Sequence, residues 1–183
     1  MSRTVEVIVT RLERAAPAGI TPPQPAGFRL ALMRAEHIPL HFYRYLYGTV
    51  GRPWLWLERA GLDDAALAGR VHKEGVEVWV LYGNGSPAAF FELDFGADAV
   101  TLVYFGLFPE WIGRRIGPWL LSNAIQEGFS RGAPLMRVST CTLDHPAALA
   151  MYQRLGFVPV SRERTTLVLS EEMAEHAAAL PPP

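Results

Sequence analysis

The stretch that decides the fold is Val103–Phe129, with the sequence VYFGLFPEWIGRRIGPWLLSNAIQEGF. Its first residues are apolar and β-branched or aromatic, which indicates a strand that ends at Leu107. From about Ile116 the apolar residues recur with helical spacing. The segment therefore predicts a strand, a short turn and a helix in direct succession.

A junction of this kind is an anion-binding site. The free N–H groups of the first helical turn and the positive end of the helix dipole converge there. Gly113 and Gly117 allow a ligand to approach the backbone closely, and Arg114 and Arg115 add positive charge. The predicted ligand is a phosphate or a pyrophosphate.

Outward from this junction, alternation and turn residues predict an α/β arrangement with a mixed, mostly antiparallel sheet flanked by helices. Asn84-Gly85 predicts a hairpin turn inside a three-stranded meander, and Asp63 is a candidate helix N-cap. The element order is β-αα-βββ-α-β-α-β, with a further extended segment expected at 28–33. Strands are expected at 4–10, 76–82, 88–95, 99–107, 135–142 and 157–169, and helices at 37–50, 64–73, 116–131, 144–155 and 170–179.

Composition limits the classes of function. The chain has 183 residues, half of them apolar, and a net charge of -1, so we expect one domain over residues 1–170 with a tail at 171–183. Neither nucleic acid nor an anionic membrane is an expected partner at that charge. The single cysteine excludes an internal disulfide and multi-cysteine metal sites. We expect a cytoplasmic protein, with a homodimer left open.

A second segment, Arg137–Phe157, reads RVSTCTLDHPAALAMYQRLGF. With the first, it resembles the GNAT superfamily of acetyl-CoA-dependent N-acetyltransferases. Residues 112–117 match that family's pyrophosphate-binding motif Gln/Arg-x-x-Gly-x-Gly/Ala, and residues 148–157 resemble its later helix with a tyrosine and a closing Gly-Phe. The likeness is best over residues 75–165. It implies a GNAT-like fold, acetyl-CoA as co-substrate, no metal, and an amine acceptor.

Three residues depart from the family pattern. Ile112 stands where Gln or Arg is usual, Arg115 replaces a glycine, and His145 stands where many relatives carry Asn. The resemblance implies a cofactor-binding set made of Leu107, Phe108, Ile112, Gly113, Arg114, Arg115, Ile116, Gly117, Pro118 and His145.

The resemblance also implies the catalytic residues. Glu92, on the middle strand of the meander, matches the general base, and Asp94 on the same face is the alternative. Tyr152 matches the tyrosine that protonates the departing thiolate. The backbone N–H of Leu107 is expected to polarise the thioester carbonyl or to hold the pantetheine arm. Cys141 as an acyl-carrying nucleophile is a further alternative, against its role as a small apolar residue.

The acceptor is an amine of unspecified identity, a small molecule or an amino-acid-like compound, attacking in a ternary complex. Trp54, Trp56 and the Tyr43–Tyr47 cluster either line its pocket or pack in the core. The substitution at Arg115 supports a rival hypothesis, a CoA-binding sensor without turnover. A third hypothesis, transfer of a longer acyl group, depends on Phe105 and Phe108.

Overall fold

The computed structural model describes residues 3–17, 19 and 21–169. They form a seven-stranded sheet in the order β2-β3-β4-β5-β6-β1-β7. The helix expected at 170–179 and the tail at 171–183 lie outside the described residues. The elements, in chain order, are β1 (Arg3–Arg14), β2 (Leu30–Arg34), α1 (Leu40–Gly51), η1 (Arg52–Trp54), α2 (Asp64–Val71), β3 (Val76–Gly83), β4 (Ser86–Phe95), β5 (Val100–Leu107), η2 (Pro109–Trp111), α3 (Ile116–Phe129), β6 (Met136–Cys141), α4 (Ala148–Arg154) and β7 (Val158–Leu169).

The predicted α/β class and the mixed, mostly antiparallel sheet are confirmed. β5 and β6 are parallel neighbours, and the other paired strands run antiparallel. The expected element order omitted β2, which forms from the segment predicted to be extended and pairs with β3 at the sheet edge. Asn84 and Gly85 both have positive φ in the turn between β3 and β4, and Asp63 caps α2 by accepting a hydrogen bond from the Ala66 N–H.

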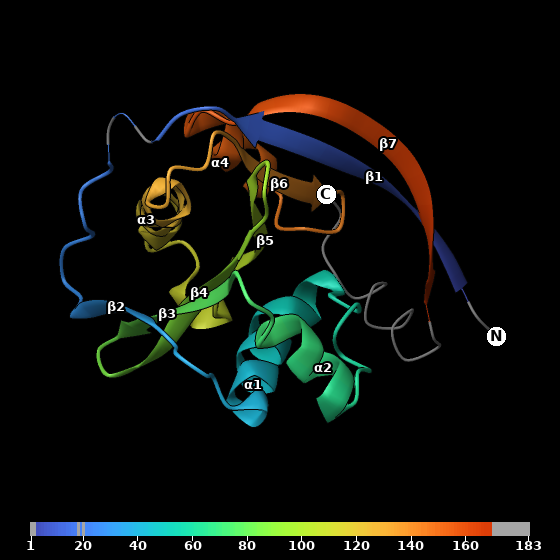
Figure 1. The fold of residues 1–183 in the computed structure, drawn as a ribbon, viewed down its shortest axis with the longest axis horizontal. Helices are drawn as coiled ribbons and strands as arrows, with labels where there is room; N and C mark the ends of the chain where they lie inside the picture. Colours follow the sequence, from blue (N-terminus) through green and yellow to red (C-terminus); the bar gives the residue numbers. More distant parts are fainter. Residues whose placement is uncertain (1–2, 18, 20, 170–183) are drawn as a thin grey trace.

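Helices cover both faces of the central strands. In Figure 1, α1 and α2 lie on one face of β3–β5 and α3 lies on the opposite face. The core between these layers is apolar, with Phe90, Leu120 and Leu46 fully buried. Gly106 of β5 permits close packing of α1, because a Cβ there would overlap the side chain of Val50.

β1 occupies an unexpected place in the sheet. It pairs with β6 on one side and with β7 on the other, although β6 and β7 are near neighbours in sequence. Together β1 and β7 form a long curved ribbon that extends beyond the rest of the sheet (Figure 1). A small second apolar cluster, centred on Leu55 and Leu169, packs this ribbon against the segment after α1.

β5 and β6 diverge soon after they meet. Their pairing covers Val100–Leu102 and Met136–Val138 and goes no further. The register between β4 and β5 shifts at the same level, since Glu92 pairs with Tyr104 and Leu93 with Leu102, which leaves Val103 as an extra residue on β5. A bulge bends a strand and ends regular pairing. The bulge at Val103 therefore opens the sheet between β5 and β6.

Candidate active site

A cavity of about 710 Å³ lies where β5 and β6 diverge. Residues from both faces of the sheet line it: Val50 and Trp56 come from α1 and the segment after it, and Gly117 and Tyr152 come from α3 and α4. α4 lies beside α3, because a Cβ on Gly117 would be 3.2 Å from the sulfur of Met151. The cavity thus connects the side of the sheet that carries α3 with the side that carries α1.

The predicted phosphate loop forms one end of this cavity. Ile112, Gly113, Arg115, Ile116, Gly117, Pro118 and His145 all line it. Gly113 and Arg115 have φ values of 80° and 62°, so the loop turns through two left-handed residues before α3 begins. Arg115 is the N-cap residue, and its side chain makes no capping hydrogen bond. The amides of the first helical turn therefore remain available to an anion.

Two residues of the predicted cofactor-binding set lie elsewhere. The guanidinium of Arg114 packs over the rings of Phe28 and Trp111, with distances of 5.5 and 5.2 Å to the ring centroids, and does not line the cavity. The Phe108 side chain is buried, and its N–H donates to the Ala88 carbonyl. Both side chains support the loop from the side that does not face the cavity.

The backbone amide of Leu107 is directed toward the cavity. Successive N–H groups of a strand point to opposite sides, and the N–H of Phe108 points to β4. The N–H of Leu107 therefore points away from β4, toward the side where pairing with β6 has ended. An N–H in this orientation can donate to a group bound in the cavity, and the catalytic role of this amide stays a prediction.

Tyr152 lies in α4 and lines the cavity near the loop. Its ring contacts Phe105 and Phe157 edge-on, at centroid distances of 6.5 and 5.8 Å. Its hydroxyl has no hydrogen-bond partner among the described residues. Burial, together with the nearby Asp144, raises the pKa of Tyr152 above its ordinary value. The hydroxyl consequently stays protonated and can donate.

His145 stands in the turn before α4. Its ring packs edge-on against Trp54 at 5.2 Å, and its Nδ1 accepts a hydrogen bond from the Ala147 N–H at 3.1 Å. Neutral His145 therefore carries its proton on Nε2. Cys141 also lines the cavity, and burial raises the pKa of its thiol, which disfavours the thiolate that a nucleophile needs.

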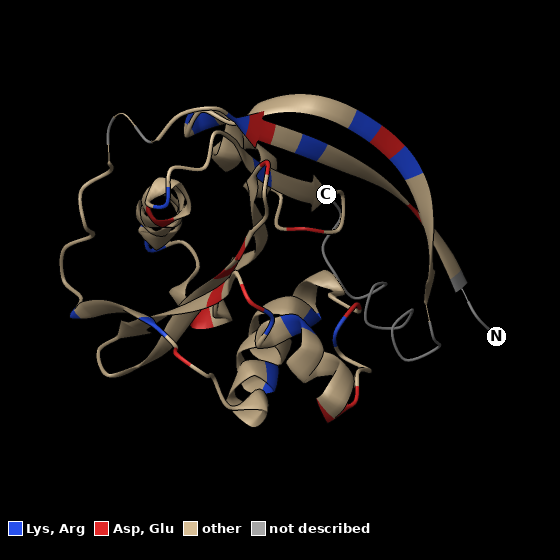
Figure 2. Ribbon diagram, viewed as in Figure 1, with Lys and Arg blue, Asp and Glu red and all other residues tan. Residues whose placement is uncertain are grey.

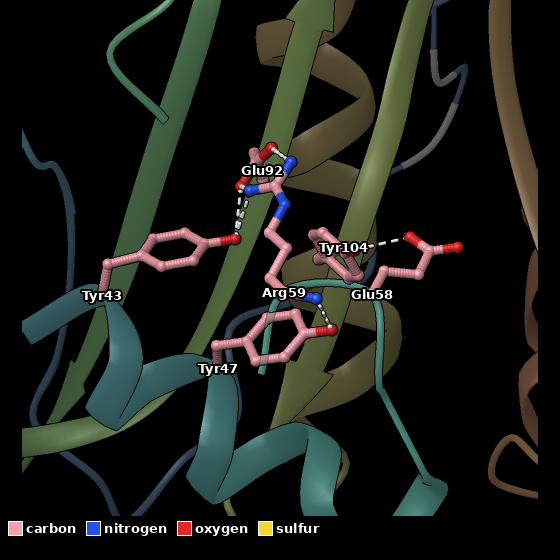
Figure 3. A network of polar contacts seen from close by, with 6 residues as sticks. All are labelled: Tyr43, Tyr47, Glu58, Arg59, Glu92 and Tyr104. Carbon is pink, nitrogen blue, oxygen red and sulfur yellow. Dashed lines mark hydrogen bonds and ion pairs between the residues drawn. The ribbon is translucent and has the colours of Figure 1, made fainter. Parts of the chain in front are cut away.

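Glu92 is fully buried and is held in a dense polar network (Figure 3). Arg59 donates to both carboxylate oxygens, Nη1 to Oε2 at 2.6 Å and Nη2 to Oε1 at 2.7 Å. The hydroxyl of Tyr43 also donates to Oε2, at 2.8 Å. Burial raises the pKa of Glu92, and the hydrogen bonds from Arg59 and Tyr43 oppose that rise.

Glu92 does not line the cavity. Asp94, the alternative base, forms an ion pair with Lys73 at 2.8 Å and lies outside the cavity as well. The structure therefore places Tyr152 and most of the predicted loop together at one site, with both candidate carboxylates set apart from it.

Other polar side chains at the site were missed from the sequence. Glu58 and Tyr104 line the cavity, and the Tyr104 hydroxyl donates to Glu58 Oε2 at 2.8 Å. Arg59, which holds Glu92, follows directly in sequence. The available signal was the segment Trp54–Arg59, an apolar connector that ends in two charged residues. Trp54, Trp56 and Tyr47 line the cavity, whereas Tyr43 is a core residue.

The described residues hold no cluster of three metal-ligating side chains, and none of their helices is long and apolar enough to cross a membrane.

Comparison with known proteins identifies relatives of the chain. The family model of the acetyltransferase (GNAT) family matches residues 40–157. A search of curated proteins finds no match.

Solved structures share the fold at low sequence identity. A GCN5-related N-acetyltransferase from Sphaerobacter thermophilus is 17% identical with a TM-score of 0.64, covering 91% of this chain and 53% of that one. One from Kribbella flavida is 15% identical with a TM-score of 0.58, over 94% of this chain and 62% of that one. The ribosomal-protein-S18-alanine N-acetyltransferase from Escherichia coli is 19% identical with a TM-score of 0.58, over 78% and 95%. This chain spans about half the length of the first of these.

Proposed function

Because this chain belongs to the acetyltransferase (GNAT) family, we propose that it transfers the acetyl group of acetyl-CoA to a primary amine, which attacks the thioester directly while both substrates are bound. The acceptor is a small molecule or an amino-acid-like compound. The observation that carries the proposal is the cavity between β5 and β6, which extends from the loop before α3 on one face of the sheet to a group of aromatic residues on the other.

The loop is suited to the diphosphate of acetyl-CoA. The amides at Ile116 and Gly117 and the helix dipole of α3 favour phosphate oxygens, and the Arg115 side chain adds a cation at the same place. Seven of the nine loop-region residues proposed from the sequence line the cavity, as does His145. Arg114 and Phe108 do not line the cavity, and we assign them to support of the loop.

The transfer step needs a donor at each of two atoms. When the amine attacks, the carbonyl oxygen becomes an oxyanion, and the N–H of Leu107 supplies a hydrogen bond to it. When the tetrahedral intermediate collapses, the C–S bond breaks and the thiolate takes a proton from the Tyr152 hydroxyl. The raised pKa of Tyr152 keeps that proton on the oxygen until the thiolate forms.

The ammonium must lose a proton before it attacks, and Glu92 remains the base proposed from the sequence. Both of its oxygens accept hydrogen bonds from Arg59, so a direct proton transfer requires Arg59 to release one of them. Replacement of Glu92 by Gln tests the role. A general base gives a loss of kcat/KM of about 10²-fold or more that is largest at low pH. A pH profile with unchanged shape removes Glu92 from the chemistry.

The alternative function is a CoA-binding sensor without turnover, and Arg115 is the observation that favours it. A side chain stands in the cavity at a left-handed position where the family motif has glycine. Calorimetry with acetyl-CoA, followed by thiol-release assays over a panel of amines, decides between the two functions. Binding with turnover supports the transferase, binding without turnover supports the sensor, and absence of binding contradicts both.

A further inference from the structure

The positively charged side chains of the cavity lie on the side of the phosphate loop and α4. Among the described residues that line it, the carboxylates are Glu58 and Asp144, and the guanidinium groups are Arg115 and Arg154. Both arginines belong to the phosphate loop or to α4, on the side where the diphosphate is proposed to bind. Asp144 is engaged locally, since its Oδ2 accepts from the Thr140 hydroxyl at 2.7 Å and from the Cys141 N–H at 2.9 Å.

Glu58 differs from Asp144 in being more exposed and in accepting one hydrogen bond, from Tyr104, where Asp144 accepts two. The residue is solvent-exposed while lining the cavity, so it lies where the cavity opens to solvent on the α1 side. Its Oε2 accepts from Tyr104, whereas Oε1 has no hydrogen-bond partner among the described residues. In Figure 3 its carboxylate lies on the far side of the Tyr104 ring from that of Glu92.

The segment that carries Glu58 is anchored by the next residue, Arg59. Arg59 forms the buried ion pair with Glu92, and its backbone N–H donates to the Tyr47 hydroxyl at 3.2 Å. The guanidinium of Arg59 also packs over the Tyr104 ring, 4.7 Å from its centroid. Glu58 is thus preorganised by its neighbour and by Tyr104, which limits the entropy lost when a ligand binds to it.

Aromatic rings line the same cavity as this carboxylate. Tyr47, Trp56 and Tyr104 all line the cavity and contact one another, with centroid distances of 5.6 Å from Tyr47 to Trp56 and 5.0 Å from Trp56 to Tyr104. Trp54 lines it too. Faces and edges of such rings bind aromatic groups and also attract cations.

We propose that Glu58 binds the ammonium group of the acceptor, and that the acceptor is a singly charged primary amine that bears an aromatic or bulky apolar group and no carboxylate. The inference rests on the proposed acetyl transfer and narrows its acceptor. An α-amino acid would place its carboxylate near Glu58 without a free cation to receive it, because both Nη atoms of Arg59 are committed to Glu92. Tyr104 acts as a positioning residue that orients the Glu58 carboxylate through its hydroxyl.

The test uses a matched pair of probes, tryptamine and tryptophan, which differ by a carboxylate. Initial rates of thiol release with saturating acetyl-CoA are measured for the wild type and for Glu58→Gln, with Glu36→Gln as the control for loss of an exposed carboxylate outside the cavity. The wild type is expected to prefer tryptamine. Glu58→Gln should raise the KM for tryptamine about tenfold or more with a smaller change in kcat, as expected for a hydrogen bond to a charged group. Tyr104→Phe should raise the same KM less.

The preference between the probes is the second readout, which a merely structural role would not change. Glu58→Gln should reduce the preference for tryptamine over tryptophan, and Glu36→Gln should match the wild type. Two results would overturn the inference and leave the proposed function intact. One is transfer to tryptamine with a KM and a preference that Glu58→Gln does not change. The other is a wild-type preference for tryptophan.

Absence of transfer to any amine would instead count against the proposed function, and direct binding then decides the inference. Calorimetry measures the affinity of tryptamine for the protein saturated with CoA. Binding that Glu58→Gln weakens about tenfold supports the ammonium site. A wild type that does not bind tryptamine, or a variant that binds it equally well, overturns the proposal.

Discussion

Replacing Arg59 by methionine leaves the carboxylate of Glu92 in the interior without its cationic partner. The side chains of Arg59 and Glu92 are 10% and 0% exposed, and two hydrogen bonds of 2.6 and 2.7 Å join them. Methionine retains much of the apolar stem, so the change isolates the charge. Breaking one side of such a buried pair costs about 3–5 kcal/mol. For a chain of this length that is a fall of roughly 6–20 °C in Tm.

A double-mutant cycle with Glu92→Gln measures the pairwise energy. We expect each single variant to be destabilised and the double variant to recover part of the loss, with a coupling of about 2–3 kcal/mol. The matched control is Arg44→Met. Its ion pair with Asp64, at 2.9 Å, is largely exposed, with side-chain exposures of 34% and 80%, so its loss should cost less than about 1 kcal/mol.

The pH dependence of the Arg59→Met variant adds a second check. A carboxyl whose pKa is raised on folding favours the folded state below its unfolded pKa, and this contribution is lost as the pH rises through the folded pKa. Burial already raises the pKa of Glu92, and loss of Arg59 raises it further. The deficit relative to the wild type should therefore be largest at neutral pH and shrink below about pH 5.

Urea denaturation monitored by tryptophan fluorescence, at several pH values, provides these free energies. An Arg59→Met variant no less stable than Arg44→Met, with a deficit independent of pH, would refute the reasoning. Glu92 would then be an ordinary solvated carboxylate, and the argument that Arg59 fixes the segment carrying Glu58 would fail with it.

Three further changes test the rest of the site. Tyr152→Phe should lower kcat by about 10²-fold, with the affinity for acetyl-CoA unchanged within about twofold. The wild type should keep its activity up to about pH 10, because burial raises the pKa of Tyr152. Full activity of the variant would assign the tyrosine to packing. Arg115→Gly should raise the free energy of unfolding by about 1 kcal/mol, since it relieves a φ of 62°. The same change should weaken acetyl-CoA binding and make its affinity less dependent on salt. An unchanged affinity in calorimetry would exclude a contact between Arg115 and phosphate. Gly106→Ala should destabilise the fold by about 1–3 kcal/mol in thermal unfolding, because the new Cβ overlaps Val50, and a neutral result would show that α1 shifts freely.

Local signals were sufficient for most of the fold and for one end of the site. The alternation along residues 76–107 and the turn at Asn84-Gly85 predict the meander, since strand pairing across a tight turn is a short-range property. The loop at Ile112–Gly117 was predicted for the same reason. Its amides lie on a contiguous segment, and helix geometry aims them without help from distant residues.

Contacts between residues far apart in the sequence decided the other end of the candidate site, which carries Glu58, Arg59 and Glu92. The Arg59–Glu92 pair joins residues 33 positions apart, and the Tyr43–Glu92 hydrogen bond spans 49. An alternating strand pattern predicts that Glu92 belongs to β4 but leaves open which cation approaches it. The position of β1 between β6 and β7 also could not be predicted from the local sequence pattern, because packing and register decide which strands pair.

The sequence by itself determined the class of the fold, the family and the place where a diphosphate is expected, because each depends on short segments with a strong conformational preference. The tertiary structure decided that Glu58 faces the cavity and that Glu92 does not. Glu92 lies on β4 in the interior, where Arg59 neutralises its charge and the Tyr43 hydroxyl donates a hydrogen bond to it. Glu58 lies in a connector without regular structure, and only long-range packing of that connector against Tyr104 and β4 turns its charge toward the cavity.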